Sequence, residues 1–495
     1  MSPLHSVAGP AQSQRPGRPS ARHLYTSLLG EHGAAPGEID DVTRAAASTF
    51  LRGCLDEVSR RDCDLPSDPK LLPEWLERTH ERTASAYRDY LDARQAGAPR
   101  RFFANRSHAL AFLRAVAPTK LVDGAWLYGL LRRAGDARLA PLIRTYLEEL
   151  GDGAAPQNHV LVYRALLAAN GCDDWQRGLG DDDYVQGAIQ LALAHDAGRL
   201  LPEVIGFNLG YEQLPLHLPI TTYELNELDI DPYYFTLHVT IDNASTGHAR
   251  KALQSALDCL PTVGDREAFY RRMVDGYKLN DLGIGTNAAI AAFDLDRELT
   301  AVLTDKARVG AQLHSDYCRV GGRTITDWLA TPADIPQLLD TLAKTGWIRR
   351  GAPVEESRFW RVLHDERGPM FGVFGAYESQ LLRDWIARPS TGDAAAPRSP
   401  NRFTPRTTRT PAATTAAPAP RAGVAAIVAH QLATIPDAQR DDDDLVALID
   451  RVATVDDRDD ALAALRGFLS PANHASPAGL VATRLYTAVF AASGA

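Results

Sequence analysis

Apolar residues recur at intervals of three and four along most of the chain, the spacing that predicts amphipathic α-helices. From Ala21 to about Arg100 this spacing predicts helices, the second of which begins at Pro73, where a missing N–H costs no helical hydrogen bond. No segment alternates polar and apolar residues for long enough to indicate a strand. The pattern therefore predicts an all-α fold.

The middle of the chain carries a series of predicted buried helices. Residues 107–131 are mostly apolar and predict two helices broken at Pro118, with Asp123 inside the second. A helix then runs to Leu150, a Gly-Asp-Gly turn ends it, and another helix starts near Asn158. Further helices are predicted over residues 180–205 and 261–347. The carboxylate of Asp123 in such an apolar run is costly unless it is paired or bound to a metal.

Composition divides the chain into four parts. Residues 1–20 predict a disordered lead, and residues 389–423, rich in Pro, Thr and Ala, predict a disordered linker. Between them, residues 21–388 form the predicted main domain. Residues 424–495 predict a small helical module, in which the run 441–444 supplies negative charge to a helix N-terminus. We expect proteolysis to cut the linker first and the fragment 1–388 to keep any bound metal.

Charge and cysteine content exclude several classes of protein. The net charge is −9, which disfavours broad nucleic-acid binding, and no apolar run is long enough to span a membrane. Five scattered cysteines, without paired spacing, indicate reduced thiols rather than a zinc site or a disulfide framework. We expect a cytoplasmic protein.

Residues of metal-ligand type gather within residues 207–257. His238 and Asp242 lie four residues apart, so on a helix they share one face, where an imidazole and a carboxylate can hold one metal ion. Upstream helices add further candidates, and the whole set is Asp123, Glu149, His159, Glu212, His238, Asp242 and His248. Four carboxylates balance two divalent ions, and oxygen and nitrogen ligands without thiolate suit iron or manganese. The same residues are also compatible with unrelated buried ion pairs in a helical interaction protein. Tyr211, Tyr223, Tyr233 and Tyr234 lie close to these residues in sequence, and one of them could donate a hydrogen bond near the metals.

The combination of EELGDG…NH, GYE and YFTLHVTIDNASTGH resembles the haem-oxygenase-like di-iron oxidases, also described as iron-containing redox enzymes. The motifs cover about residues 100–260. The resemblance implies a haem-oxygenase-like bundle and two Fe²⁺ ions. It places the early carboxylate on Asp123, the Glu-to-His pair on Glu149 and His159 (with Glu148 as a substitute), and the later glutamate on Glu212. His238, Asp242 and His248 complete the ligand set.

The sequence departs from the family pattern at His248. Here the spacing is His-x3-Asp-x5-His, and six residues on a regular helix carry His248 about 240° away from Asp242. A π-bulge or a break at Gly247 would restore a shared site, whereas Ser245 would be a poor replacement for a histidine ligand.

The resemblance implies a non-haem di-iron enzyme that uses O2 to oxidise a small amino-acid- or fatty-acid-like substrate. N-oxygenation, desaturation and oxidative C–C cleavage are the reactions that it implies. The alternatives are the helical interaction protein and a cofactorless oxidase on the same fold. The expected partners are O2 and the small molecule, with neither nucleic acid nor membrane. The sequence identifies no electron donor, is compatible with a homodimer, and makes residues 424–495 a candidate protein-binding module.

Overall fold

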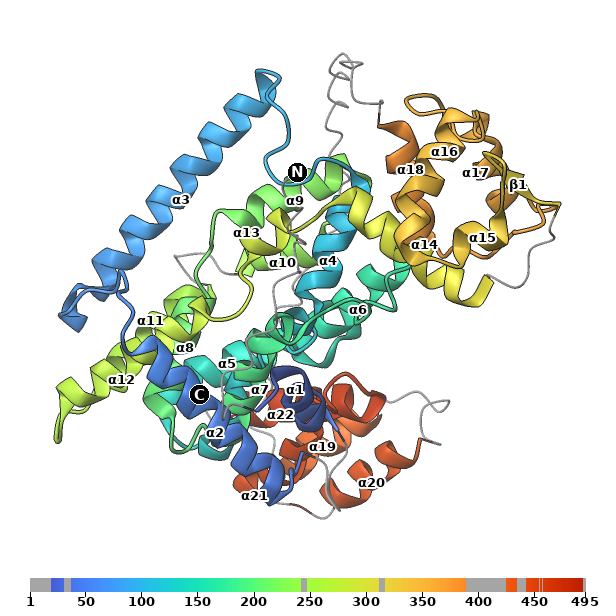
Figure 1. The fold of residues 1–495 in the computed structure, drawn as a ribbon. Coiled ribbons are helices and arrows are strands. Elements are labelled where there is room, and N and C mark those ends of the chain that lie inside the picture. Colours follow the sequence, from blue (N-terminus) through green and yellow to red (C-terminus); the bar gives the residue numbers. More distant parts are fainter. Residues whose placement is uncertain are drawn as a thin grey trace.

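The computed structural model describes residues 19–30, 37–241, 247–310, 317–388, 424–433, 442–453, 455 and 457–492. The predicted lead (except residues 19 and 20), the predicted linker 389–423 and Asp242 lie outside these residues. Within them, all regular structure is helical except one antiparallel ladder, in which Arg319 of β1 (Arg319–Val320) lies opposite Thr324 of β2 (Arg323–Thr324). The predicted all-α class is therefore confirmed (Figure 1).

The helices follow the chain in four groups. The first group is α1 (Ala21–Leu29), α2 (Asp41–Val58) and α3 (Leu72–Gln95). The second group is α4 (Arg106–Lys120), α5 (Ala140–Glu149), α6 (His159–Ala169), α7 (Val185–Asp196), α8 (Leu201–Tyr211), α9 (His217–Glu227), α10 (Tyr233–Ile241), α11 (His248–Asp258) and α12 (Arg266–Lys278). The third group is α13 (Thr286–Ala291), α14 (Leu295–Gly310), α15 (Ile325–Leu329), α16 (Ile335–Lys344), α17 (Arg358–His364) and α18 (Ala376–Ala387). The C-terminal group is α19 (Val424–Ala433), α20 (Asp443–Val452), α21 (Arg458–Arg466) and α22 (Pro477–Ala491).

Short 3-10 helices connect many of these elements. They are η1 (Pro69–Leu71), η2 (Ala125–Arg133), η3 (Ala137–Leu139), η4 (Gly151–Gly153), η5 (Ala155–Gln157), η6 (Asp181–Tyr184), η7 (Leu279–Asp281), η8 (Pro332–Asp334), η9 (Val354–Glu356) and η11 (Gly467–Leu469). Within the described residues, no helix combines the length and apolar character that crossing a membrane would require.

The prediction around Pro118 was wrong in one respect. Helix α4 continues through Pro118 and ends at Lys120, so the break comes later and Asp123 lies in a turn rather than inside a helix. Because Pro118 occupies the last turn of α4, its missing N–H removes only one helical hydrogen bond. The segment that follows, η2, is a 3-10 helix rather than a second α-helix.

Two hydrophobic clusters organise the molecule. The first contains apolar residues of α1, α2, α5, α7, α8 and α11, and the second contains those of α4, α6, α9, α10 and α14–α18. Helices α14–α18 form a lobe at one end of the molecule (Figure 1). The helices that carry the candidate ligands come from both clusters, so those ligands lie where the two clusters meet.

The C-terminal helices pack into the first cluster. Leu445, Leu465, Leu485 and Tyr486 are fully buried and belong to the same cluster as the apolar residues of α5 and α7. Asp442 caps α20 by accepting from the N–H of Leu445, which confirms the predicted role of the acidic run. The apolar side of the module thus faces its own chain.

Candidate metal centre

A tight reversal of the chain brings Glu149 and His159 together. Glu149 is the last residue of α5, and His159 is the first residue of α6, which Asn158 caps by accepting from the N–H of Leu161. Between them, η4 contains three successive left-handed residues, with φ of 64° at Gly151, 51° at Asp152 and 79° at Gly153. Glycine adopts such angles without strain, so the Gly-Asp-Gly sequence allows this turn.

Asp123 reaches the same place from the turn after α4. The next residue, Gly124, has φ of 78°, and a Cβ built on it would lie 2.8 Å from the Cβ of Glu149. Because glycine has no side chain, the turn can lie directly against Glu149. This close approach sets the carboxylate of Asp123 beside the end of α5.

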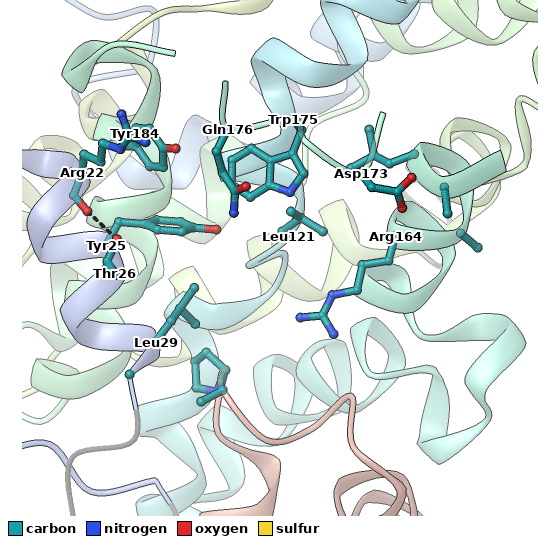
Figure 2. Close-up of a pocket in the computed structure, with 16 residues that line it drawn as sticks. Arg22, Tyr25, Thr26, Leu29, Leu121, Arg164, Asp173, Trp175, Gln176 and Tyr184 are labelled. Atoms are coloured by element: carbon teal, nitrogen blue, oxygen red, sulfur yellow. Dashed lines mark hydrogen bonds between the residues drawn. The ribbon is translucent and has the colours of Figure 1, made fainter. Parts of the chain in front are cut away.

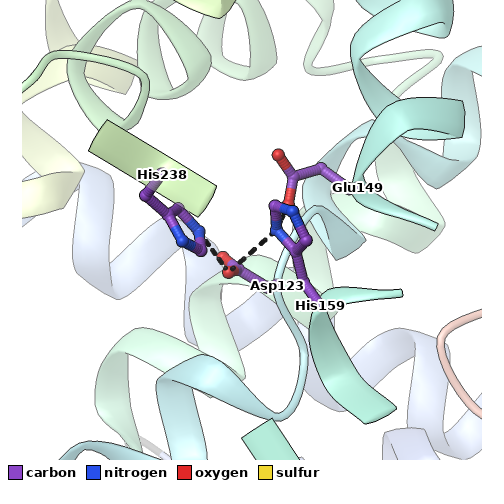
Figure 3. Close-up of side chains that lie close together, drawn as sticks. All are labelled: Asp123, Glu149, His159 and His238. Atoms are coloured by element: carbon purple, nitrogen blue, oxygen red, sulfur yellow. Dashed lines mark hydrogen bonds and ion pairs between the residues drawn. The ribbon is translucent and has the colours of Figure 1, made fainter. Parts of the chain in front are cut away.

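One group of four side chains is formed by Asp123, Glu149, His159 and His238 (Figure 3). Nε2 of His238 lies 3.0 Å from Oδ2 of Asp123, and Nδ1 of His159 lies 3.8 Å from the same oxygen. Nδ1 of His159 also contacts Oε2 of Glu149. Each residue offers one ligand atom, and these four atoms lie within 4.8 Å of one another.

A second group consists of Glu149, Glu212 and His248. Nδ1 of His248 lies 3.2 Å from Oε1 of Glu149 and 3.2 Å from Oε2 of Glu212. Glu212 directly follows α8, and His248 is the first residue of α11. Glu149 therefore belongs to both groups: its Oε2 faces the first and its Oε1 faces the second.

Hydrogen bonds from outside the two groups set the ring orientation of His238 and of His248. Nδ1–H of His238 donates to the backbone oxygen of Tyr234 at 2.9 Å when the ring is neutral, which leaves Nε2 facing Asp123. Nε2 of His248 lies 2.8 Å from Glu148, which leaves Nδ1 facing Glu149 and Glu212. Such outer hydrogen bonds select the tautomer that presents a lone pair to a metal.

Two tyrosines and a lysine surround Asp123. Tyr211 donates to its Oδ1 at 3.0 Å and Tyr234 donates to its Oδ2 at 2.5 Å. Lys120 donates to the hydroxyl of Tyr211 at 3.2 Å. Tyr211 and Tyr234 thus hold the carboxylate from outside the cluster, while Tyr223 packs against Tyr90, away from it.

Burial and neighbouring charges shift the pKa values of Glu149 and His159 in opposite directions. Burial raises the pKa of Glu149, but His159 and His248 outweigh it and hold the pKa at about 2. Burial lowers the pKa of His159, whereas Glu149 and Asp123 raise it to about 10. In the metal-free chain a proton on His159 thus offsets part of the carboxylate charge, and a bound cation would take that place.

Buried carboxylates elsewhere in the described residues have different partners. Glu203 accepts two hydrogen bonds from Arg272, Glu227 pairs with Arg94, and Glu224 accepts from Tyr90 and from backbone N–H groups of residues 101–103. These three carboxylates thus have the hydrogen-bond or ion-pair partners that buried acids need.

The candidate cluster is not complete in that sense. Oε2 of Glu149 and Nδ1 of His159 are buried and contact each other, and among the described residues no group outside the cluster hydrogen-bonds to either atom. Two such atoms facing one another, with oxygen and nitrogen donors around them, fit a metal ion at roughly 2 Å from each ligand. The residues present therefore fit a metal-binding site.

Six of the seven predicted residues converge here and are at most 5% exposed: Asp123, Glu149, His159, Glu212, His238 and His248. The seventh, Asp242, lies outside the described residues. Glu149 rather than Glu148 faces the cluster, and His248 reaches it as the first residue of α11, which starts after Gly247, a residue with extended backbone. The break at Gly247 is thus the alternative that the structure adopts.

The sequence did not indicate that Glu148 would contact both His248 and Lys251, or that Lys120 would hydrogen-bond to Tyr211 beside Asp123. Glu148 also contacts Lys251 and lies 3.0 Å from Arg144, so its position one residue before Glu149 directs it to cations at the edge of the cluster. His217 lies in neither group; burial, together with Lys120, lowers its pKa to about 3.

The C-terminal module contacts the turn between Glu149 and His159. Arg484 donates to the backbone oxygen of Gly153 at 2.9 Å, and Thr487 donates to Asp152 at 3.2 Å. His474 lies 3.1 Å from the side-chain amide of Asn158, which caps α6. The module therefore touches both sides of the turn that positions the two candidate ligands.

Comparison with known families agrees with this geometry. Residues 110–279, about a third of the chain, match a family model described as iron-containing redox enzyme. This segment contains all seven predicted ligands, and the resemblance inferred from the motifs is confirmed over it. No curated protein and no solved structure matches the chain. The match and the buried cluster together support an iron-dependent oxidoreductase.

Proposed function

We propose that the chain, which carries an iron-containing redox enzyme domain, is a non-haem di-iron oxidase or oxygenase that uses O2 to oxidise a small substrate. The observation that carries the proposal is the position of Glu149, which presents one carboxylate oxygen to each of two ligand groups. A carboxylate placed in this way can bridge two ions.

The two groups support one assignment of the ligands. Asp123, Glu149, His159 and His238 would hold one Fe²⁺, while Glu149, Glu212 and His248 would hold the other. Asp242 is proposed from the sequence as a further ligand, on the predicted helical face of His238. The four carboxylates then balance two divalent charges, and the absence of thiolate ligands favours iron or manganese over structural zinc.

Bound Fe²⁺ would supply electrons for the reduction of O2. The chain's own residues hold the ligands in place and keep bulk water away, because all six described ligands are buried. Tyr211 and Tyr234 orient Asp123, and Glu148 orients His248. We propose a small amino-acid- or fatty-acid-like substrate, with N-oxygenation, desaturation or oxidative C–C cleavage as the outcome, in a cytoplasmic enzyme.

Anaerobic titration with Fe²⁺ tests the proposal. The full-length chain should bind about two ions, as a di-metal site requires, and should give a transient absorbance on mixing with O2. Glu149→Gln should reduce binding at both positions, because it removes the shared ligand, whereas Asp123→Asn should weaken one ion more than the other.

Glu224→Gln is the matched control, since Glu224 is buried but contacts no candidate ligand. It should keep two ions. A stoichiometry near zero in the wild type would instead support the interaction protein with structural ion pairs. If Glu149→Gln still bound two ions with unchanged affinity, the shared-ligand assignment would be wrong.

A further inference from the structure

A cavity lies apart from the candidate metal centre. It has a volume of about 930 Å³ and is bounded by α1, α6, the segment after α6 and residues 471–472 of the C-terminal module (Figure 2). Cavities that bind small molecules have volumes of roughly 300–1,000 Å³. This space is therefore large enough for a small ligand.

Helix α6 separates this cavity from the metal ligands. His159 is the first residue of α6, and Ala168, nine residues later, lines the cavity. Nine residues correspond to about two and a half turns, so the two side chains leave opposite sides of the helix. A ligand in the cavity would lie across α6 from His159, and Leu121, two residues before Asp123, would form part of its wall.

The wall of the cavity is aromatic. Tyr25 and Tyr184 are buried and lie edge to face, with ring centroids 5.3 Å apart, and Trp175 lies against Tyr184 at 6.2 Å. In Figure 2, Tyr25 and Tyr184 lie on the left of the cavity, and Trp175 lies nearer its middle. Such rings favour the flat faces of an aromatic ligand.

Two polar groups on the wall have no partner among the described residues. Neither the hydroxyl of Tyr25 nor Nε1–H of Trp175 forms a hydrogen bond with them, although both belong to side chains that line the cavity. Tyr25 is buried and Trp175 is half-buried, and neither of these two atoms is among the fully buried polar atoms without a partner. Both groups can therefore form a hydrogen bond with a ligand or with water in the cavity.

Opposite charges lie on the far side. Arg164 and Asp173 both line the cavity, and neither forms an ion pair with the other or with another described residue (Figure 2). By contrast, neighbouring Asp174 and Arg177 are each engaged in ion pairs. Arg164 and Asp173, both exposed to solvent, thus face the same space, and Arg22, which lies over the ring of Tyr184, is a second cation in the lining.

We propose that this cavity binds a zwitterionic aromatic small molecule, such as an aromatic α-amino acid. The aryl group lies against Tyr25, Tyr184 and Trp175, the carboxylate faces Arg164, and the ammonium group faces Asp173. Guanidinium and carboxylate form charge-assisted hydrogen bonds that are stronger than neutral ones. The site does not depend on the proposed iron chemistry.

Calorimetric titration of the full-length chain with L-phenylalanine tests the proposal. Two comparison ligands each lack one charge: 3-phenylpropanoate has no ammonium group, and phenethylamine has no carboxylate. L-phenylalanine should bind most tightly. Arg164→Gln and Asp173→Asn should each weaken its binding by about tenfold, the effect expected for a hydrogen bond to a charged group.

Two control variants test whether the ligand binds in this cavity. Arg78→Gln removes an exposed arginine of α3, far from the cavity lining, and should leave binding unchanged. Glu149→Gln should also leave it unchanged, even where it abolishes iron binding. Equal binding of the three ligands, undetectable binding of L-phenylalanine at millimolar concentration, or loss of binding in Glu149→Gln but not in Arg164→Gln would each overturn the proposal.

Discussion

The contact between the C-terminal module and the turn at Gly153 gives a sharp prediction for Gly153→Ala. A Cβ at this position would lie 2.3 Å from the backbone oxygen of Leu480 and 2.8 Å from the backbone nitrogen of Arg484, both in α22. The residue also has φ of +79°. Alanine would therefore introduce backbone strain and a clash with another helix at the same time.

The two effects can be sized separately. A left-handed conformation costs an L-residue roughly 1–2 kcal/mol, and overpacking of a tight contact costs about 1–3 kcal/mol. Together they predict a loss of about 2–5 kcal/mol in the free energy of unfolding. Iron occupancy should fall as well, because the turn lies between Glu149 and His159 and must shift to relieve the clash.

Gly346→Ala is a matched control. Gly346 has the same φ of +79°, but nothing lies within 4 Å of the added Cβ. It should lose only the backbone part, about 1–2 kcal/mol, and should keep its iron. Denaturant unfolding measures the two free energies, and anaerobic Fe²⁺ titration measures occupancy.

Equal losses of stability and equal iron stoichiometry in the two alanine variants would refute this reasoning. That result would mean that α22 can move away from Gly153 at little cost. It would also mean that the module does not help to hold the turn.

Four other expectations follow from the structure. Fe²⁺ should raise the melting midpoint of the wild type but leave His238→Ala nearly unmoved, and an equal rise in both would remove His238 from the site. Truncation after residue 423 should reduce iron occupancy, because it removes the contacts of Arg484 and Thr487 with the turn between Glu149 and His159. The sequence alone predicted that the fragment 1–388 keeps its metal, and full iron occupancy of the truncated chain would support that earlier prediction. Glu224→Ala should destabilise the chain by about 2 kcal/mol or more, because it leaves buried N–H groups without an acceptor, and denaturant unfolding measures this loss. Burial and the charges of Arg44 and Arg132 lower the pKa of His195 to about 4. Its contribution to stability is therefore present above pH 6.5 and is lost as the pH falls towards 4; His195→Gln should flatten that fall in unfolding measurements at several pH values.

The sequence by itself determined the helical class and the kinds of residue at the candidate centre. Spacing of three and four predicted the helices, and the acidic run before α20 predicted its cap, because both depend on residues close together in the chain. The motifs also identified six residues that the structure brings together. These features are local, so neighbouring residues are sufficient to indicate them.

Tertiary structure decided which of two adjacent glutamates faces the cluster. Glu148 and Glu149 differ by about 100° around α5, and only packing of that helix selects the inward one. Likewise, the sequence allowed either a bulge or a break before His248, and the start of α11 after Gly247 set the outcome.

The position of the C-terminal module also came only from the tertiary structure. Composition separates residues 424–495 from the main domain, yet their apolar residues share its first hydrophobic cluster, and Arg484 reaches Gly153. Such contacts join residues far apart in the chain. They depend on the shapes of assembled helices, which the spacing of residues along any one helix does not contain.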